Sequence, residues 1–130
     1  MSRTILIIED NEQNMYMMRF LLEKNGFSVA GAQDGMAGLE AARRLLPQAI
    51  LLDIQLPAMD GYAVAAELRK DPLLQAIPII AVTSYAMPGA WEKVMAAGAD
   101  GYIEKPINPE TFVAEIRSFL PTQSPRGGNP

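Results

Sequence analysis

The sequence predicts an α/β fold in which a parallel β-sheet is covered by helices on both faces. Five short apolar runs of strand length alternate with five segments whose apolar residues recur at helical spacing. The runs are apolar at almost every position, which is typical of strands buried on both faces of a sheet. Glycine, proline and helix-capping residues separate the segments. This alternation indicates a doubly wound parallel sheet.

The five predicted strands are short. The clearest is AILLDI, whose single charged residue, Asp53, stands near its C-terminal end. The fourth strand has Pro78 near its start, where a missing backbone N–H is tolerated. The predicted strands span residues 5–8, 27–32, 49–54, 77–83 and 101–104.

The five predicted helices carry apolar stripes that can face the sheet. They span residues 11–25, 34–46, 60–70, 88–98 and 108–120. The stripes consist of Met15, Met18 and Leu22; Leu39, Ala42 and Leu46; Val64, Ala65 and Leu68; and Val113, Ile116 and Leu120.

The ends of these helices also have sequence signals. Asp34 and Asn108 can cap helices through their side-chain oxygens. Pro88 and Pro109 suit a first helical turn, which has no partner for their missing N–H groups. Gly26, Pro47 and Gly98 mark helix ends.

We expect residues 1–120 to form one domain with the flavodoxin-like strand order 2-1-3-4-5. The final stretch, PTQSPRGGNP at residues 121–130, is rich in proline, glycine and polar residues and predicts a flexible tail.

The composition narrows the possible chemistry. The chain of 130 residues has no cysteine and no histidine, which excludes disulfides, zinc–thiolate sites, thiol nucleophiles, Ser-His-Asp triads and histidine bases. Carboxylates, hydroxyls and lysines remain, and their oxygens suit a hard cation such as Mg²⁺. A net charge of −4 without a basic patch argues against nucleic-acid binding. Because there is no membrane-length apolar run or signal peptide, we expect a cytoplasmic protein.

Polar residues gather where the predicted strands end. Glu9 and Asp10 follow the first strand, Asp53 ends the third, Thr83 ends the fourth and Lys105 follows the fifth. In a doubly wound sheet, ligands bind at the carboxyl ends of the strands near the reversal of strand order. Three neighbouring carboxylates repel one another, so either their pKa values rise or a cation binds. The alternative is that each is an ordinary solvated loop residue, which requires several coincidences at neighbouring strand ends.

This cluster contains the protein groups needed for phosphoryl transfer to a carboxylate. Asp53 can act as the nucleophile and form an aspartyl phosphate. Lys105 and Thr83 can then bond the phosphoryl oxygens, so that the protein contributes position and charge neutralisation.

Four motifs give the chain a family resemblance. They are ILIIEDN, ILLDIQLPAMDGY, IIAVTSYAM and GYIEKPI, one at each of strands one, three, four and five. Together they resemble response-regulator receiver domains, from about residue 4 to residue 120. The resemblance implies two-component or phosphorelay signalling, in which Asp53 accepts a phosphoryl group from a sensor histidine kinase or a histidine phosphotransfer protein.

The resemblance also implies a metal site and a switch. Asp10 would bind Mg²⁺, with help from Glu9 and with the backbone carbonyl of Gln55 as a further ligand. Thr83 and Lys105 would respond to the phosphoryl group. Tyr102 would be the aromatic that changes rotamer as Thr83 moves; its alternative role is that of an ordinary amphipathic aromatic on an edge strand. The Lys105–Pro106 bond is a candidate cis peptide.

The same resemblance places partner docking on the fourth helix, fifth strand and fifth helix. Residues of that face would include Met87, Trp91, Tyr102 and Ile107. Trp91 can lie outward as an interface anchor or pack inward one turn before Val94, and the sequence leaves both open. Gln55 and Tyr85 occupy positions that affect phosphoryl lifetime in the family, and Ser84 stands where alanine or glycine is commoner.

The sequence offers three alternatives to this function. A magnesium-dependent phosphohydrolase with an aspartyl nucleophile would place that residue after the first strand, where this chain has EDNE. Flavin or nucleotide carriers need phosphate loops that are absent here. A receiver-like scaffold that is never phosphorylated is the third alternative. We expect a signalling protein rather than an enzyme. Met1 and the short tail favour a free-standing protein over a receiver module cut from a longer one. The expected partners are a downstream protein and, as a further candidate, a second copy of the chain.

Overall fold

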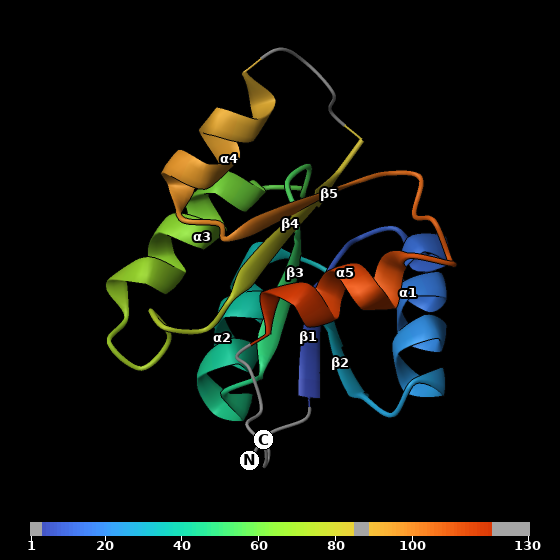
Figure 1. Cartoon of the computed structure of the whole chain (residues 1–130). Coiled ribbons are helices and arrows are strands. Elements are labelled where there is room, and N and C mark those ends of the chain that lie inside the picture. Colours follow the sequence, from blue (N-terminus) through green and yellow to red (C-terminus); the bar gives the residue numbers. More distant parts are fainter. Residues whose placement is uncertain (1–3, 85–88, 121–130) are drawn as a thin grey trace, which may run out of the picture.

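The computed structural model of the chain describes residues 4–84 and 89–120. Strands and helices alternate strictly through these residues, as the sequence predicts (Figure 1). The elements are β1 (Thr4–Ile8), α1 (Glu12–Lys24), β2 (Ser28–Ala32), α2 (Gly35–Leu45), β3 (Ala49–Asp53), α3 (Gly61–Lys70), β4 (Ile79–Thr83), α4 (Ala90–Ala97), β5 (Gly101–Glu104) and α5 (Phe112–Phe119).

The strands form one parallel sheet in the order β2-β1-β3-β4-β5, which confirms the predicted topology. The central strands β1, β3 and β4 are buried almost throughout, whereas β2 is only partly buried. This difference arises because β2 is an edge strand with a neighbour on one side only.

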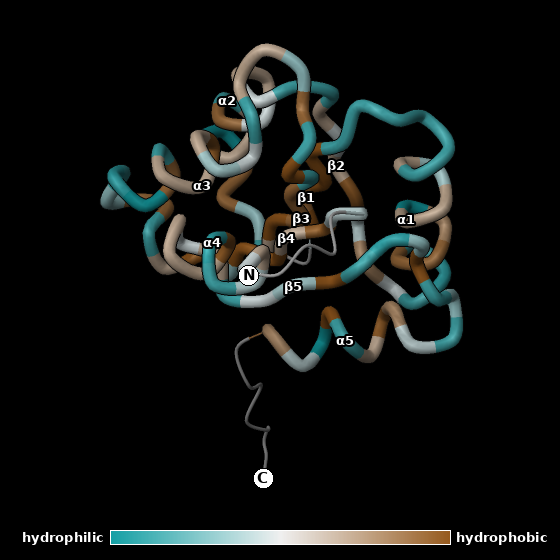
Figure 2. Tube along the Cα trace, turned by 90° about the horizontal axis from the view of Figure 1, so that it is seen from above, coloured by the Kyte–Doolittle hydropathy of each residue, from teal (hydrophilic) through white to brown (hydrophobic). Residues whose placement is uncertain are grey.

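Two helical layers enclose the sheet, and each layer has its own hydrophobic core. Figure 2 shows the apolar strands between α1 and α5 on one face and α2, α3 and α4 on the other. Alternate residues of β1 point into opposite cores: Leu6 and Ile8 toward α2 and α3, Ile5 and Ile7 toward α1 and α5. Each fully buried leucine or isoleucine contributes ~1.5–3 kcal/mol, so the central strands hold the layers together.

Side-chain caps begin three of the helices, and the one at Asp34 confirms the sequence prediction. Asn11 accepts a hydrogen bond from the backbone N–H of Asn14 at the start of α1. Asp34 and Asp60 cap α2 and α3 in the same way, each bonding an N–H three residues later. These caps satisfy N–H groups that the first helical turn leaves without a partner.

The structure differs from the sequence prediction at the ends of several helices and strands. Helix α5 begins at Phe112 rather than at Pro109, because Asn108 first bonds the N–H of Glu110 in a separate turn. Leu46 does not face the core; it ends α2 in a left-handed conformation and is exposed. Strand β4 begins at Ile79, after Pro78.

Some predictions concern residues outside those described. These are the helix start at Pro88 and the tail at residues 121–130, so both remain predictions. None of the helices in the described part of the chain has both the length and the apolar character that a membrane crossing requires.

Gly61 fixes the approach of α3 to the strand that carries Asp53. Its N–H donates to the carbonyl of Ile54 at 2.9 Å. A Cβ at this position would lie 2.5 Å from the Ile54 Cα and 2.6 Å from the Asp53 carbonyl oxygen. Backbone atoms cannot swing aside as a flexible side chain can, so only glycine fits here without a shift of α3.

We therefore expect Gly61→Ala to lower the free energy of unfolding by about 1–3 kcal/mol, because the added methyl group overpacks against the backbone. Urea unfolding followed by circular dichroism measures the change. Gly31→Ala is the matched control, since its Cβ would meet only the mobile ends of Met15 and Arg19. Equal losses in the two variants would contradict this explanation.

Candidate functional site

The parallel sheet brings five sequence-predicted residues to one edge. Asp53 and Thr83 end β3 and β4, while Glu9, Asp10 and Lys105 directly follow β1 and β5. Since β1, β3, β4 and β5 are neighbours in that order, their carboxyl ends meet at the same place. Residues far apart in the sequence thus form one cluster through strand register alone.

Three carboxyl groups form the centre of this cluster. Oxygen atoms of Glu9, Asp10 and Asp53 all lie within 4.8 Å of one another. Glu9 is 1% exposed and Asp53 is 3% exposed, whereas Asp10 reaches solvent. Burial of charged carboxylates is costly unless a positive group accompanies them.

Lys105 supplies positive charge at the cluster. Its Nζ lies 2.9 Å from Glu9 Oε1 and 3.5 Å from Asp53 Oδ2, and its side chain is largely buried. The Lys105 backbone N–H donates to the carbonyl of Thr83 at 2.9 Å, which ties this residue to the end of β4. The Lys105–Pro106 peptide bond is cis, as the family resemblance implied.

The surroundings of Glu9 shift the pKa of its carboxyl group. Burial raises the pKa of Glu9 above its ordinary value, and the nearby negative charge of Asp53 raises this pKa further. The hydrogen bonds from Lys105 and from the backbone N–H of Asn11 act in the opposite direction, but they do not cancel the effect of burial. The fold therefore holds Glu9 in a place that disfavours its negative charge.

The donor set fits a hard divalent cation. Three carboxyl groups whose oxygens lie within 4.8 Å of one another offer the type of ligand that Mg²⁺ prefers. One lysine does not neutralise three carboxylates, and a divalent cation would remove the remaining repulsion.

A hydrogen bond bridges the two loops beside Asp53. Ser84 Oγ donates to Gln55 Oε1 at 2.9 Å, and the Gln55 backbone N–H donates to Asp53 Oδ1 at 3.0 Å. Sequence reasoning singled out Ser84 and Gln55 separately but missed their contact. No local signal could reveal it, because the two residues belong to different strand–helix connections.

The residues assigned to the partner face have different environments. Trp91 is 57% exposed, so its side chain points outward and not into the core beside Val94. Tyr102 is half-buried, and burial together with the charge of Glu104 raises the pKa of its hydroxyl.

Ile107 is only 6% exposed and packs into the core on the α1 and α5 face, so its predicted place on the partner face is wrong. Met87, like Tyr85, lies outside the described residues.

A family model, the response regulator receiver domain, matches residues 5–117. The chain belongs to the response regulator receiver family. It is therefore a component of two-component signalling, as the motifs implied.

Known proteins resemble this chain over nearly its whole length. The polar-differentiation response regulator DivK of Brucella ovis is 41% identical over 120 residues, which cover 92% of this chain and 98% of DivK. Among solved structures, the Vibrio cholerae chemotaxis protein CheY4 has a TM-score of 0.87 at 27% identity, with 92% of this chain and 100% of that one covered.

A second solved structure bears on the acidic cluster. The receiver domain of the sensor histidine kinase PA1611 from Pseudomonas aeruginosa has a TM-score of 0.83 and 31% identity, covering 92% of this chain and 98% of its own. That structure contains a magnesium ion coordinated in its active-site cleft.

The raised pKa of Glu9 predicts a pH dependence of stability in metal-free protein. The folded state binds the Glu9 proton more tightly than the unfolded chain does, so stability is lost as the pH rises from 4.5 through the raised pKa. Wild type should therefore lose stability relative to Glu9→Gln over that range. Urea unfolding in EDTA at several pH values measures the difference.

Glu40→Gln serves as the control for that experiment, because it removes an exposed carboxylate on α2. A difference between wild type and Glu9→Gln that stays constant with pH would contradict the predicted effect of burial.

Proposed function

We propose that the chain accepts a phosphoryl group on Asp53 from a phosphohistidine of a sensor histidine kinase or a histidine phosphotransfer protein. One observation carries the proposal: Asp53 ends a central strand among two further carboxyl groups, with the Lys105 ammonium 3.5 Å from its Oδ2. A buried carboxylate beside a fixed cation is positioned to act as a nucleophile. The donor histidine must belong to another chain, since this one contains none.

The transfer forms one bond and breaks one. An oxygen of the Asp53 carboxylate forms a P–O bond as the P–N bond to the donor imidazole breaks, and that imidazole nitrogen keeps the electron pair. The surrounding side chains position the carboxylate and balance charge, which is the main contribution of proteins to phosphoryl transfer. The Gln55 N–H at 3.0 Å and Lys105 hold the two Asp53 oxygens in place before the reaction.

The acidic cluster would hold Mg²⁺ through Glu9, Asp10, Asp53 and the backbone carbonyl of Gln55. When bound, the cation neutralises phosphoryl oxygens and removes the repulsion among the carboxylates. The oxygen-only donor set within 4.8 Å supports this, and so does the magnesium ion in the cleft of the PA1611 receiver domain.

Phosphorylation would change the charge that Thr83 and Lys105 face. A phosphoryl group adds up to about two negative charges and three acceptor oxygens. Lys105 can pair with one such oxygen, and the Thr83 hydroxyl can bond another at the end of β4. This would draw Thr83 toward the phosphoryl group, with Tyr102 as the adjoining aromatic. The exposed Trp91 on α4 supports a docking face for a downstream protein partner in the cytoplasm.

Asp53→Asn should abolish phosphorylation and leave the fold intact, because the amide has no anionic oxygen to attack phosphorus. Incubation with acetyl phosphate and Mg²⁺ followed by intact mass spectrometry measures the transfer. Wild type should gain one phosphoryl group, and Asp71→Asn, which changes an aspartate outside the cluster, should gain it as well. A phosphoryl adduct on the Asp53→Asn protein would sink the proposal.

Asp10→Asn should weaken Mg²⁺ binding at least about tenfold, because it removes an anionic ligand without changing a buried side chain. A ligand at a hundred times its Kd raises stability by about 2.7 kcal/mol, so Mg²⁺ should raise the Tm of wild type clearly and that of the variant little. Differential scanning calorimetry measures the shifts. Glu12→Gln, an exposed substitution in the first turn of α1, should behave as wild type. Equal shifts in Asp10→Asn and wild type would argue against this ligand set.

A further inference from the structure

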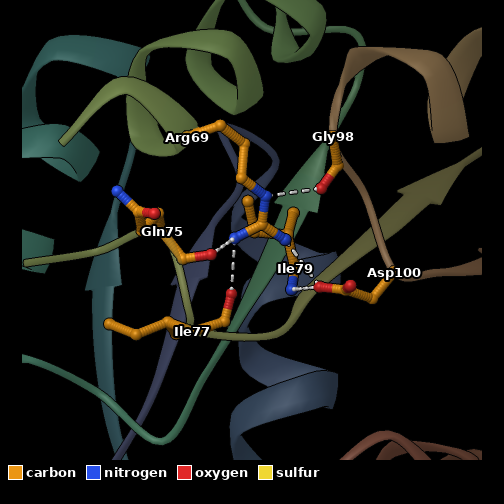
Figure 3. Close-up of polar contacts among 6 residues, drawn as sticks. All are labelled: Arg69, Gln75, Ile77, Ile79, Gly98 and Asp100. Carbon is orange, nitrogen blue, oxygen red and sulfur yellow. Dashed lines mark hydrogen bonds and ion pairs between the residues drawn. The ribbon is translucent and has the colours of Figure 1, made fainter. Parts of the chain in front are cut away.

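Arg69 joins three segments at the end of the sheet opposite the phosphorylation site (Figure 3). It lies in the last turn of α3. Its Nε donates to the carbonyl of Gly98 at 2.8 Å, and its Nη2 lies 2.6 Å from Asp100 Oδ2. Its Nη1 donates to the carbonyls of Gln75 at 2.8 Å and Ile77 at 2.9 Å. The guanidinium thus binds both the segment before β4 and the segment before β5.

The planar guanidinium is needed for this arrangement. The four hydrogen bonds use Nε and both terminal nitrogens in different directions. A lysine has three N–H donors on a single nitrogen and cannot reach all four acceptors. The side chain is only 23% exposed, so these bonds are partly shielded from water.

Asp100 extends the network to the first residue of β4. Its Oδ2 accepts the backbone N–H of Ile79 at 2.9 Å, and its own N–H donates to the Ile79 carbonyl at 2.7 Å. The carboxylate therefore links the Arg69 guanidinium to the sheet itself. This places Asp100, in the segment between α4 and β5, in a fixed position relative to β4.

The carboxyl end of α4 is held tightly by the same arginine. Gly98 ends α4 with φ +121°, a conformation that favours glycine. A Cβ at Gly98 would lie 2.7 Å from Arg69 Cγ, so the arginine stem packs directly on this residue. The Arg69 side chain thus fixes Gly98 in two ways, by packing against its Cα and by a hydrogen bond to its carbonyl.

Among the described residues, the amino end of α4 has fewer attachments than the carboxyl end. The N-cap position is occupied by Gly89, which has no side chain to cap the helix, and a Cβ there would meet nothing within 4 Å. Within α4, all of which the structure describes, Val94 is the only buried residue. Lys93 lies over the ring of Tyr62 at 4.7 Å near the middle of the helix, and Trp91 near its start is exposed.

From this asymmetry we infer that Arg69 makes the carboxyl end of α4 a fixed pivot. A displacement that starts at Thr83 then moves the amino end, which carries Trp91, and leaves Gly98 in place. A helix of this length spans about 12 Å, so a tilt about one end moves the other end most. The inference rests on the proposed phosphorylation of Asp53 and assigns Arg69 as a positioning residue of the resulting switch.

The test compares Arg69→Gln with wild type and with Arg44→Gln, which removes an equal charge from the exposed face of α2. Before phosphorylation, amide hydrogen exchange at residues 98–101 should be about tenfold faster in Arg69→Gln, because the hydrogen bonds to a charged group are lost. Arg44→Gln should match wild type. Unchanged exchange at these amides in Arg69→Gln would contradict the claim that Arg69 holds the carboxyl end of α4.

The second readout is acrylamide quenching of Trp91, the single tryptophan, before and after treatment with acetyl phosphate and Mg²⁺. Wild type should show a change in quenching while exchange at residues 98–101 stays within about twofold. Arg69→Gln should gain the phosphoryl group to the same extent by intact mass, yet lose at least about half of the quenching change, since its helix has no fixed end.

The outcomes separate the two proposals. If Arg69→Gln is phosphorylated and its Trp91 responds as in wild type, the arginine only stabilises the fold and the pivot is wrong. A wild type whose mass does not change contradicts the proposed function, and the pivot fails with it. If Arg69→Gln does not fold, Arg69→Lys and Asp100→Asn replace it in both measurements. Each keeps part of the hydrogen-bond network, so each should lose a smaller part of the change in Trp91 quenching.

Discussion

Two carboxylates almost removed from solvent, those of Glu9 and Asp53, lie at one edge of the sheet and share the ammonium group of Lys105. Burial disfavours the ionised form of a carboxyl group, and a neighbouring negative charge adds to this effect. The raised pKa of Glu9 reflects both causes. The fold keeps this costly arrangement because its remaining strands are apolar and well packed. The excess negative charge makes the edge receptive to a cation and sensitive to any added phosphate.

The parallel sheet is what makes this concentration of charge possible. Each crossover returns the chain to the same side, so that every strand ends at the same edge. The central position of β3, between β1 and β4, places Asp53 between the acidic residues on one side and Thr83 on the other. Gly61 lets α3 begin directly against this strand, which keeps the connection after Asp53 short and close.

The two ends of the sheet have different properties. At the carboxyl edge, the groups around Asp53 are charged and incompletely neutralised, so a new charge can rearrange them. At the amino edge, Arg69 and Asp100 form a satisfied network that joins α3, α4, β4 and β5. A helix that is held at one end in this way can move at its other end while the core stays intact.

The sequence by itself determined the order of elements, the cap at Asp34 and the residues of the acidic cluster, because each of these depends on local spacing or on parallel strand order. Only the tertiary structure decided that Trp91 lies outward and Ile107 inward, since neither the helical spacing around Trp91 nor the family resemblance of Ile107 says which neighbours cover the side chain. The contacts of Ser84 with Gln55 and of Arg69 with Gly98 and Asp100 likewise join residues about thirty positions apart. Such pairs leave no periodic signal, because the packing of separate elements, and not the local chain, brings them together.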